Sequence, residues 1–389
     1  MAIDTRTDEI ELEIAAMESR EPTPSLHPSG ATSAGRVCIA MIVCLGLWAL
    51  LLAPSLERDA EAGPVGTRRA MALAVLRPLT AIAAGLSVDR ATETVERAIG
   101  RDANERPGGS LVLPPIELPP ETTPRLTPQP ETRNGHGGRA DAISQPDPSA
   151  IGPTPAAEPE PVDVSIRLPE SGNELRVAVV GDSLSQGLGP AVVELFDPEV
   201  ADVLPLGRRS TGLARLDYFN WQAAMRQLVD GFRPDLVFVM LGSNDDQAQI
   251  GPDGSTVEVG TAAWADAYRD RAARFLREAT SGGARVVWVG IPVVQDRQRW
   301  EFYRRVNDIY GETAAADPLA TYVDAWAWFQ AKEGGYTAYL RNERGVLQEM
   351  RAGDGIHFTP TGYGYLARVA VRAAGEAFAL PQQAVRFRL

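Results

Sequence analysis

The longest uninterrupted run of apolar residues lies near the N-terminus, at residues 37–56, and it contains no charged side chain. A helix of this length spans about 30 Å, which matches the hydrocarbon core of a bilayer. A buried helix of a soluble protein and a cleavable signal peptide have similar compositions, and Ala60-Glu61-Ala62 would serve as a cleavage site. Because the preceding tail, residues 1–35, is acidic rather than basic, we predict an uncleaved signal anchor at residues 36–56.

Two further segments separate this run from the C-terminal part of the chain. Residues 57–104 are predicted to be helical, but their apolar stretch contains Arg77-Pro78, and a charge beside a helix breaker argues against a second membrane span. This segment could form a helical hairpin or lie on the membrane surface. Residues 105–169 hold 15 of the 30 prolines and show no apolar period, which predicts a disordered linker. The linker would either let the following domain work away from the membrane or act only as a spacer.

The remaining residues, 170–389, alternate between short β-branched runs and longer amphipathic stretches. The runs predict strands at 175–180, 200–206, 235–241, 285–289 and 320–323. The amphipathic stretches predict helices at about 188–196, 217–231, 261–281 and 297–315, and a last helix after the cap Thr359-Pro360. Strands that alternate with helices in this way predict a parallel sheet covered on both faces, in one doubly wound domain. Residues 325–353 fit neither pattern and could form a lid.

Charge and composition narrow the possible partners. The chain has 389 residues and a net charge of −13, and residues 170–389 carry 28 acidic and 23 basic side chains. This domain lacks the basic excess that binding to a phosphate backbone needs, so no nucleic-acid partner is expected. Both cysteines, Cys38 and Cys44, lie in the apolar run, and His357 is the only histidine of the domain. A cysteine-based or His-rich metal site therefore cannot be built there, and we expect no metal and no cofactor.

Polar loops lie where the predicted strands end, which is where the chemistry of doubly wound domains takes place. The blocks are Gly181-Asp182-Ser183-Leu184-Ser185, Arg209-Ser210-Thr211-Gly212, Gly242-Ser243-Asn244-Asp245 and, before the last helix, Asp354-Gly355-Ile356-His357. Each block alone is more typical of a turn or a helix cap than of catalysis. Their joint occurrence at one edge of the predicted sheet indicates a site.

These blocks supply the groups that nucleophilic catalysis needs. Ser183 lies at a strand-to-helix turn and is a candidate nucleophile, and His357 is the one histidine available to take its proton. Asp354, three residues earlier, is near enough to accept the Nδ1 proton of His357 and to fix its tautomer. The backbone N–H groups of Ser183 and Gly212 and the side-chain amide of Asn244 are candidate donors to an oxyanion.

In this order the four blocks resemble the signature blocks of the SGNH, or GDSL, hydrolases, over residues 181–357. The resemblance implies a flavodoxin-like three-layer α/β/α sandwich with a five-stranded parallel sheet. It also implies that Ser183 is the nucleophile, His357 the base and Asp354 its orienting residue, with an oxyanion hole formed by Ser183, Gly212 and Asn244. More narrowly, the chain is similar to membrane-anchored bacterial members described as a domain of unknown function.

This resemblance implies a serine esterase of the cell envelope that hydrolyses short acyl esters, such as O-acetyl groups on polysaccharide or peptidoglycan. The chain would be held in a bacterial inner membrane by residues 37–56, with its catalytic domain in the periplasm. An O-acyltransferase that passes the same acyl group to a sugar hydroxyl is one alternative. A non-catalytic polysaccharide-binding protein is another, in which sugars would stack on Trp221, Trp264, Trp288, Trp300, Trp326 and Trp328.

Overall fold

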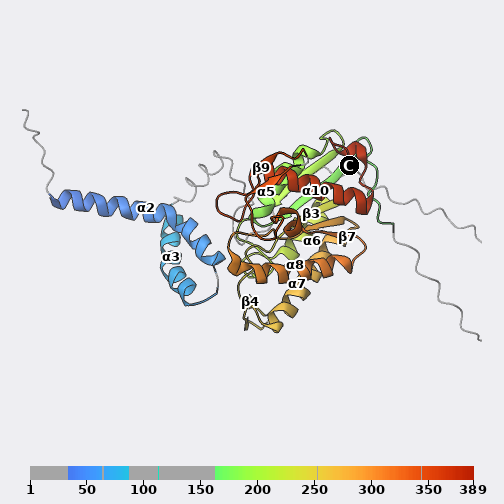
Figure 1. Ribbon diagram of the computed structural model, residues 1–389. Helices are drawn as coiled ribbons and strands as arrows, with labels where there is room; N and C mark the ends of the chain where they lie inside the picture. Colours follow the sequence, from blue (N-terminus) through green and yellow to red (C-terminus); the bar gives the residue numbers. More distant parts are fainter. Residues whose placement is uncertain (1–33, 64, 87–112, 114–162, 252, 343) are drawn as a thin grey trace, which may run out of the picture.

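The computed structural model describes residues 34–63, 65–86, 113, 163–251, 253–342 and 344–389. Most of the acidic tail, residues 1–35, and most of the predicted linker, residues 105–169, lie outside this part of the chain. The described residues form an N-terminal pair of helices and a C-terminal α/β domain (Figure 1).

The C-terminal domain is built on one parallel sheet of five strands in the order β2-β1-β3-β6-β7. The strands are β1 (Leu175–Gly181), β2 (Ala201–Gly207), β3 (Leu236–Met240), β6 (Arg285–Val289) and β7 (Ala320–Val323). Strand β1 pairs with β2 on one side and β3 on the other, so the chain reverses its direction of winding there. This is the flavodoxin-like strand order, in which sites form beside the carboxyl ends of the strands on either side of that reversal.

Helices cover both faces of the sheet and make it the middle layer of three (Figure 1). Val177 and Val179 of β1 point into the core under α5 and α10, whereas Ala178 and Val180 point into the core under α6, α7 and α8. The bounds of these helices are α5 Ser183–Leu195, α6 Trp221–Phe232, α7 Ala262–Thr280, α8 Trp300–Ala315 and α10 Pro360–Phe378. The predicted three-layer α/β fold is therefore confirmed.

Five short elements complete the domain. They are the β4–β5 hairpin (Gln249–Ile250 and Thr256–Val257), the β8–β9 hairpin (Tyr339–Arg341 and Leu347–Glu349), helix α9 (Ala325–Phe329) and the 3-10 turns at Arg297–Arg299 and Gln382–Ala384. The segment 325–353, which sequence pattern left unassigned, is thus α9 followed by the β8–β9 hairpin.

Two predicted helix starts are wrong. The helix expected from about residue 217 begins at Trp221, because the Asn220 side chain caps it by accepting a hydrogen bond from the Ala223 N–H. The helix expected from residue 188 begins at Ser183, because Asp182 caps it: its carboxylate accepts a hydrogen bond of 2.9 Å from the Leu184 N–H. The Gly187, Gly189 and Pro190 residues lowered the apparent helix propensity. They are accommodated because Tyr363 and Pro205 pack where side chains on Gly187 and Gly189 would lie. The predicted cap of the last helix is confirmed, with Thr359 Oγ1 accepting from the Gly362 N–H at 3.1 Å.

The N-terminal helices are α2 (Ala34–Ala62) and α3 (Thr67–Gly85), which pack against each other as a hairpin. Helix α2 is long and apolar enough to cross a membrane, and no other described helix is. A signal sequence near an N-terminus has the same character. Helix α3 continues through Pro78, and Arg77 contacts Glu57 and Glu61 of α2. The hairpin expected within the segment 57–104 is not the one seen, because α3 pairs with α2, and residues 87–104 lie outside the described part of the chain.

Candidate active site

Ser183 lies at the junction between β1 and α5, and close packing of the backbone fixes this turn. Gly181 ends the strand with φ +143°, and a Cβ atom there would lie 1.8 Å from the Met240 carbonyl oxygen of β3. Only glycine fits this approach. Asp182 then caps α5 and leaves Ser183 as the first residue of the helix, partly exposed at the carboxyl edge of the sheet.

His357 is positioned by a tight turn that begins at Asp354. Asp354 Oδ1 accepts hydrogen bonds from the backbone N–H groups of Ile356 (2.8 Å) and His357 (2.9 Å). Gly355 has φ +72°, and its carbonyl oxygen accepts a hydrogen bond of 3.0 Å from the Gln295 N–H. One carboxylate oxygen thus holds the turn, and the other is available for the imidazole ring.

Three side chains form a continuous line of hydrogen bonds. Asp354 Oδ2 lies 2.6 Å from His357 Nδ1, and His357 Nε2 lies 2.8 Å from Ser183 Oγ. Because an ionised carboxylate can only accept, Nδ1 carries the proton and Nε2 accepts from the serine hydroxyl. Partial burial raises the pKa of Asp354, but hydrogen bonds from Ile356 and His357 outweigh it and lower the pKa overall. Asp354 therefore stays ionised and holds this tautomer.

The candidate oxyanion donors come from the loops after β1, β2 and β3. Among the hydrogen bonds of the described residues, the backbone N–H groups of Ser183 and Gly212 donate none. The Asn244 amide donates to the Thr211 carbonyl at 3.0 Å and makes only a long contact of 3.4 Å with Ser243 Oγ. Two backbone donors, and the second N–H of this amide, are thus available to an incoming oxygen.

Two buried aspartates hold these loops together by hydrogen bonds. The sequence pattern had not indicated this structural role. Asp182, besides capping α5, accepts hydrogen bonds from the backbone N–H (2.9 Å) and the hydroxyl (2.7 Å) of Ser243. It therefore ties the Ser183 turn to the Asn244 loop. Burial raises the pKa of Asp182 to about 6, although the bonds from Ser243 and Leu184 favour the ionised form.

Asp245 holds the Gly212 loop in place in the same way. Its carboxylate accepts from the N–H groups of Leu213 (2.8 Å) and Ala214 (2.9 Å) and from the Tyr268 hydroxyl (2.6 Å). A Cβ atom on Gly212 would lie 2.0 Å from this carboxylate, so glycine is required there for packing. Burial raises the pKa of Asp245, with the hydrogen bond from Tyr268 opposing it.

A buried arginine supports the histidine loop in a comparable way. Arg351 is fully buried, and its guanidinium donates to the carbonyl oxygens of Val293 and Ile356 and lies over the Phe358 ring. Burial lowers the pKa of Arg351 to about 10. Its position in the sequence, six residues before His357 and outside every block, gave no sign of this role.

The six tryptophans that could have stacked on sugars are mostly internal. Trp221, Trp264 and Trp288 are fully buried, and Trp326 is nearly so. Trp300 is half-buried and donates to the Val294 carbonyl oxygen, which leaves Trp328 as the one exposed ring of the set. The loop 246–260 is also partly internal: Gln247 and Gln249 are buried, and they bond the backbone of Asn244 and Trp264 respectively.

A family model covers most of the α/β domain. The model of the family described as "Protein of unknown function (DUF459)" matches residues 176–373. The chain belongs to this family. The match includes all five predicted site residues, Ser183, Gly212, Asn244, Asp354 and His357, and excludes the α2–α3 hairpin. The narrower resemblance drawn from the sequence, to a domain of unknown function, is thereby confirmed.

Solved structures similar to this one cover about half of the chain. The catalytic domain of peptidoglycan O-acetyltransferase A from Streptococcus pneumoniae has 17% identity over 52% of this chain and 94% of that chain, with a TM-score of 0.36. A catalytic mutant of the acetylxylan esterase Axe2 from Geobacillus stearothermophilus has 16% identity over 52% and 94%, with a TM-score of 0.37. A GDSL-like lipase from Bacteroides thetaiotaomicron has 15% identity over 52% and 89%, with a TM-score of 0.36.

At these scores the similarities do not decide the activity of this chain. A comparison with curated proteins gives no match. The functional argument therefore depends on the site itself.

Proposed function

We propose that this DUF459 protein is a membrane-anchored serine esterase of the SGNH type that hydrolyses short acyl esters in the cell envelope. The observation that carries the proposal is the line from Asp354 through His357 to Ser183, with bonds of 2.6 and 2.8 Å. A serine hydroxyl bonded to an imidazole whose other nitrogen meets a carboxylate has the geometry of an activated nucleophile.

The proposed reaction begins when Ser183 Oγ attacks the ester carbonyl carbon and His357 Nε2 takes the hydroxyl proton. The carbonyl oxygen becomes an oxyanion that accepts hydrogen bonds from the N–H groups of Ser183 and Gly212 and from the Asn244 amide. His357 then gives the proton to the leaving alcohol, which breaks the ester bond and leaves an acyl group on Ser183. Water, deprotonated by His357, attacks the acyl carbonyl carbon; the bond to Ser183 Oγ then breaks, His357 returns the proton to this oxygen, and the acid is released.

A covalent probe tests the nucleophile directly. The full chain, in detergent, is treated with a fluorophosphonate, and Ser183→Ala is compared with Ser185→Ala. Ser185 is the matched control because it lies in the same block, but its hydroxyl donates to the Asp182 carbonyl at 2.8 Å rather than to a base. We expect labelling of the unmodified chain and of Ser185→Ala only. Labelling that persists in Ser183→Ala would contradict the proposal.

The acyl acceptor needs a separate assay. We propose O-acetyl groups of envelope polysaccharide or peptidoglycan as the substrates, with water as the acceptor. Products from an O-acetylated sugar and an unmodified sugar offered together would identify the acceptor: free acetate indicates hydrolysis, and newly acetylated sugar indicates an O-acyltransferase. The non-catalytic alternative is disfavoured because most of its candidate tryptophans are buried.

We further propose that α2 anchors the chain in the inner membrane and leaves the catalytic domain in the periplasm. Support comes from the length and apolar surface of α2, of which 6% is buried in its most apolar window. Protease added to spheroplasts should remove the α/β domain, and the intact mass of the extracted protein should show no cleavage after Ala62. A domain accessible only after lysis would overturn the orientation.

A further inference from the structure

The α2–α3 hairpin is docked on the catalytic domain through a buried arginine. Arg215, 2% exposed, follows the Gly212 loop, and its guanidinium donates to the backbone carbonyl oxygens of Gly63 (2.8 Å) and Glu61 (3.2 Å). Both acceptors belong to the end of α2 and the turn into α3. Because Arg215 meets backbone rather than side chains, the contact depends on the shape of this turn.

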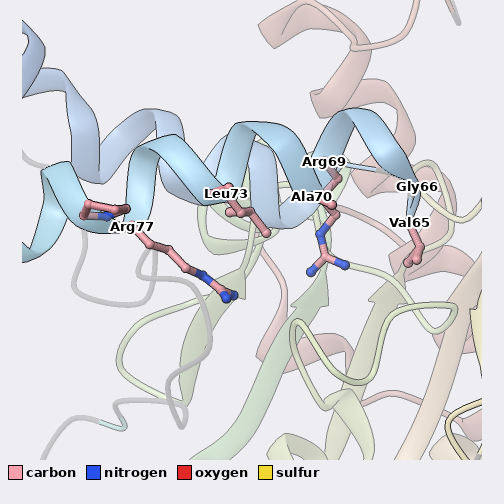
Figure 2. Close-up of a pocket in the computed structure, with 8 residues that line it drawn as sticks. Val65, Gly66, Arg69, Ala70, Leu73 and Arg77 are labelled. Atoms are coloured by element: carbon pink, nitrogen blue, oxygen red, sulfur yellow. The ribbon is translucent and has the colours of Figure 1, made fainter.

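An ion pair on the other side of the turn completes the contact. Asp217 holds Arg215 with two hydrogen bonds, of 2.8 and 2.9 Å, and its carboxylate lies 4.0 Å from Arg69 of α3. Arg69 and Arg77 point from α3 toward the α/β domain, beside a cavity of about 580 Å³ that α3 and the preceding turn line (Figure 2). Next to Arg69, Arg68 is exposed.

The docked surface is continuous with the candidate active site. Arg215 is three residues from Gly212, and its guanidinium donates to Gln247 Oε1 at 3.2 Å. Gln247 in turn donates to the Asn244 carbonyl oxygen at 2.6 Å. Two of the three oxyanion loops are therefore adjacent to the hairpin.

This contact fixes how far the site is from the apolar segment. Leu56, the last residue of the apolar run, precedes Gly63 by seven residues, which corresponds to a length of about 10 Å along a helix. From Arg215 to Gly212 is three residues, at most about 10 Å of chain. The Arg215 side chain and its bond to Gly63 add less than about 10 Å, so the Gly212 loop lies within about 30 Å of the bilayer surface if α2 spans the membrane.

We infer that the α2–α3 hairpin clamps the catalytic domain with its active-site edge beside the membrane, so that the substrate is an acyl ester on the headgroup side of a membrane-anchored carrier. This rests on the proposed function and names its substrate class. A domain held only by the long proline-rich linker would instead sample esters far from the membrane. The acyl chains of ordinary phospholipids are not the expected substrate, because their esters lie within the bilayer interface rather than above it.

Cross-linking tests the clamp without reference to activity. In membranes carrying the full chain, with Cys38 and Cys44 replaced by alanine, Glu61→Cys is paired with Tyr218→Cys and treated with a short thiol–thiol cross-linker. Glu61 meets Arg215 through its backbone carbonyl oxygen, which the substitution keeps. Burial raises the pKa of the Tyr218 hydroxyl, and the Glu61 carboxylate is near enough to raise it further. The control pair is Glu61→Cys with Glu199→Cys, because Glu199 is exposed at the opposite edge of the sheet, before β2. We expect cross-linking of the first pair alone. Equal yields, or no product from either pair, would overturn the clamp.

The cross-linked protein then tests the substrate class. Two acetate esters are compared in phosphatidylcholine vesicles: soluble 4-methylumbelliferyl acetate, and the acetate of an umbelliferone carrying a hexadecyl anchor. We expect the locked enzyme to hydrolyse the anchored ester within about twofold of the rate before cross-linking. No fatty acid should be released from the phosphatidylcholine.

The remaining outcomes separate the two proposals. If locking abolishes hydrolysis of the anchored ester but preserves that of the soluble one, the docked state is not the working state and the inference is wrong. Fatty acid release would place the substrate in the bilayer itself and would also overturn it. If neither ester is cleaved in any form, although the cross-link forms, the proposed esterase function fails and the substrate class with it, while the docked hairpin stands.

Discussion

Three aspartates surround the proposed nucleophile, and their surroundings give them different tasks. Asp182 and Asp245 are fully buried and accept hydrogen bonds from loops of the α/β domain and from residues of α5 and α7. Asp354, with a side chain 49% exposed, accepts from its own turn and from the imidazole of His357. The buried pair holds the loops in place, and the exposed residue is positioned to orient the proposed base. The same side chain therefore contributes to stability or to chemistry according to what it contacts.

The largest expected effect follows from removing the base. His357→Ala should lower esterase turnover by about 10⁴-fold or more, because no other group of the domain is available to take the Ser183 proton. The side chain of His357 is 34% exposed, so the melting temperature should change little. Hydrolysis of 4-methylumbelliferyl acetate and thermal unfolding in detergent measure both. Turnover within tenfold of the unmodified chain would refute the triad.

Asp354→Asn tests whether the exposed aspartate acts in the reaction rather than in the fold. The asparagine oxygen can still accept from the backbone of Ile356 and His357, which turns the NH₂ group toward Nδ1 and forces the proton onto Nε2. That tautomer cannot accept the serine proton, so kcat should fall by about 10³- to 10⁴-fold. Stability should change by less than about 1 kcal/mol, since the side chain is half exposed. A large loss of stability would mean that Asp354 serves the fold instead.

Asp245→Asn applies the same substitution to a buried aspartate and tests its contribution to the stability of the fold. One of the carboxylate oxygens becomes an NH₂ donor, which leaves at least one of Leu213 N–H, Ala214 N–H and the Tyr268 hydroxyl without an acceptor. We expect a loss of about 3 kcal/mol in the free energy of unfolding, measured by denaturant titration. An unfolding free energy unchanged by Asp245→Asn would break the comparison.

The last expected effect, no larger than the loss in Asp245→Asn, is a dependence of stability on pH. The pKa of Asp182 is raised to about 6 in the folded protein, above the usual value near 3.8. Between these values the folded state binds more protons than the unfolded state, so this residue makes stability fall as pH rises from 4 to 6. The contribution should be up to about 3 kcal/mol, and it should vanish in Asp182→Asn. A slope that survives this substitution would belong to another group.

Sequence pattern predicted much of this fold because the relevant forces are local. The strands β1, β3 and β6 are apolar runs that are almost wholly buried, and the predicted ends of all five strands differ from the observed ends by at most one residue. The error at Ser183 arose where a cap and tertiary packing outweighed weak helix propensity. Which side of the sheet each helix covers also follows from chain order and right-handed crossovers.

The sequence identified the side chains that are proposed to react. It did not identify the residues that hold the loops of the site in place. Ser183, His357 and Asp354 were identifiable because few residue types can perform their proposed roles, and the domain contains a single histidine. Arg351, Gln247 and Arg215 were missed because an arginine or glutamine is ordinarily a solvated surface residue. Their burial is visible only once distant segments lie together.

The sequence by itself therefore determined the order of the elements, the side chains proposed to react and the apolar run that could enter a membrane. Only the tertiary structure decided which aspartates are buried, how Arg215 joins the hairpin to the oxyanion loops, and where the catalytic edge lies relative to α2. The reason is physical. Periodicity and residue chemistry are properties of short stretches of chain, whereas a hydrogen bond between residues 63 and 215 exists only when two segments far apart in the sequence lie together.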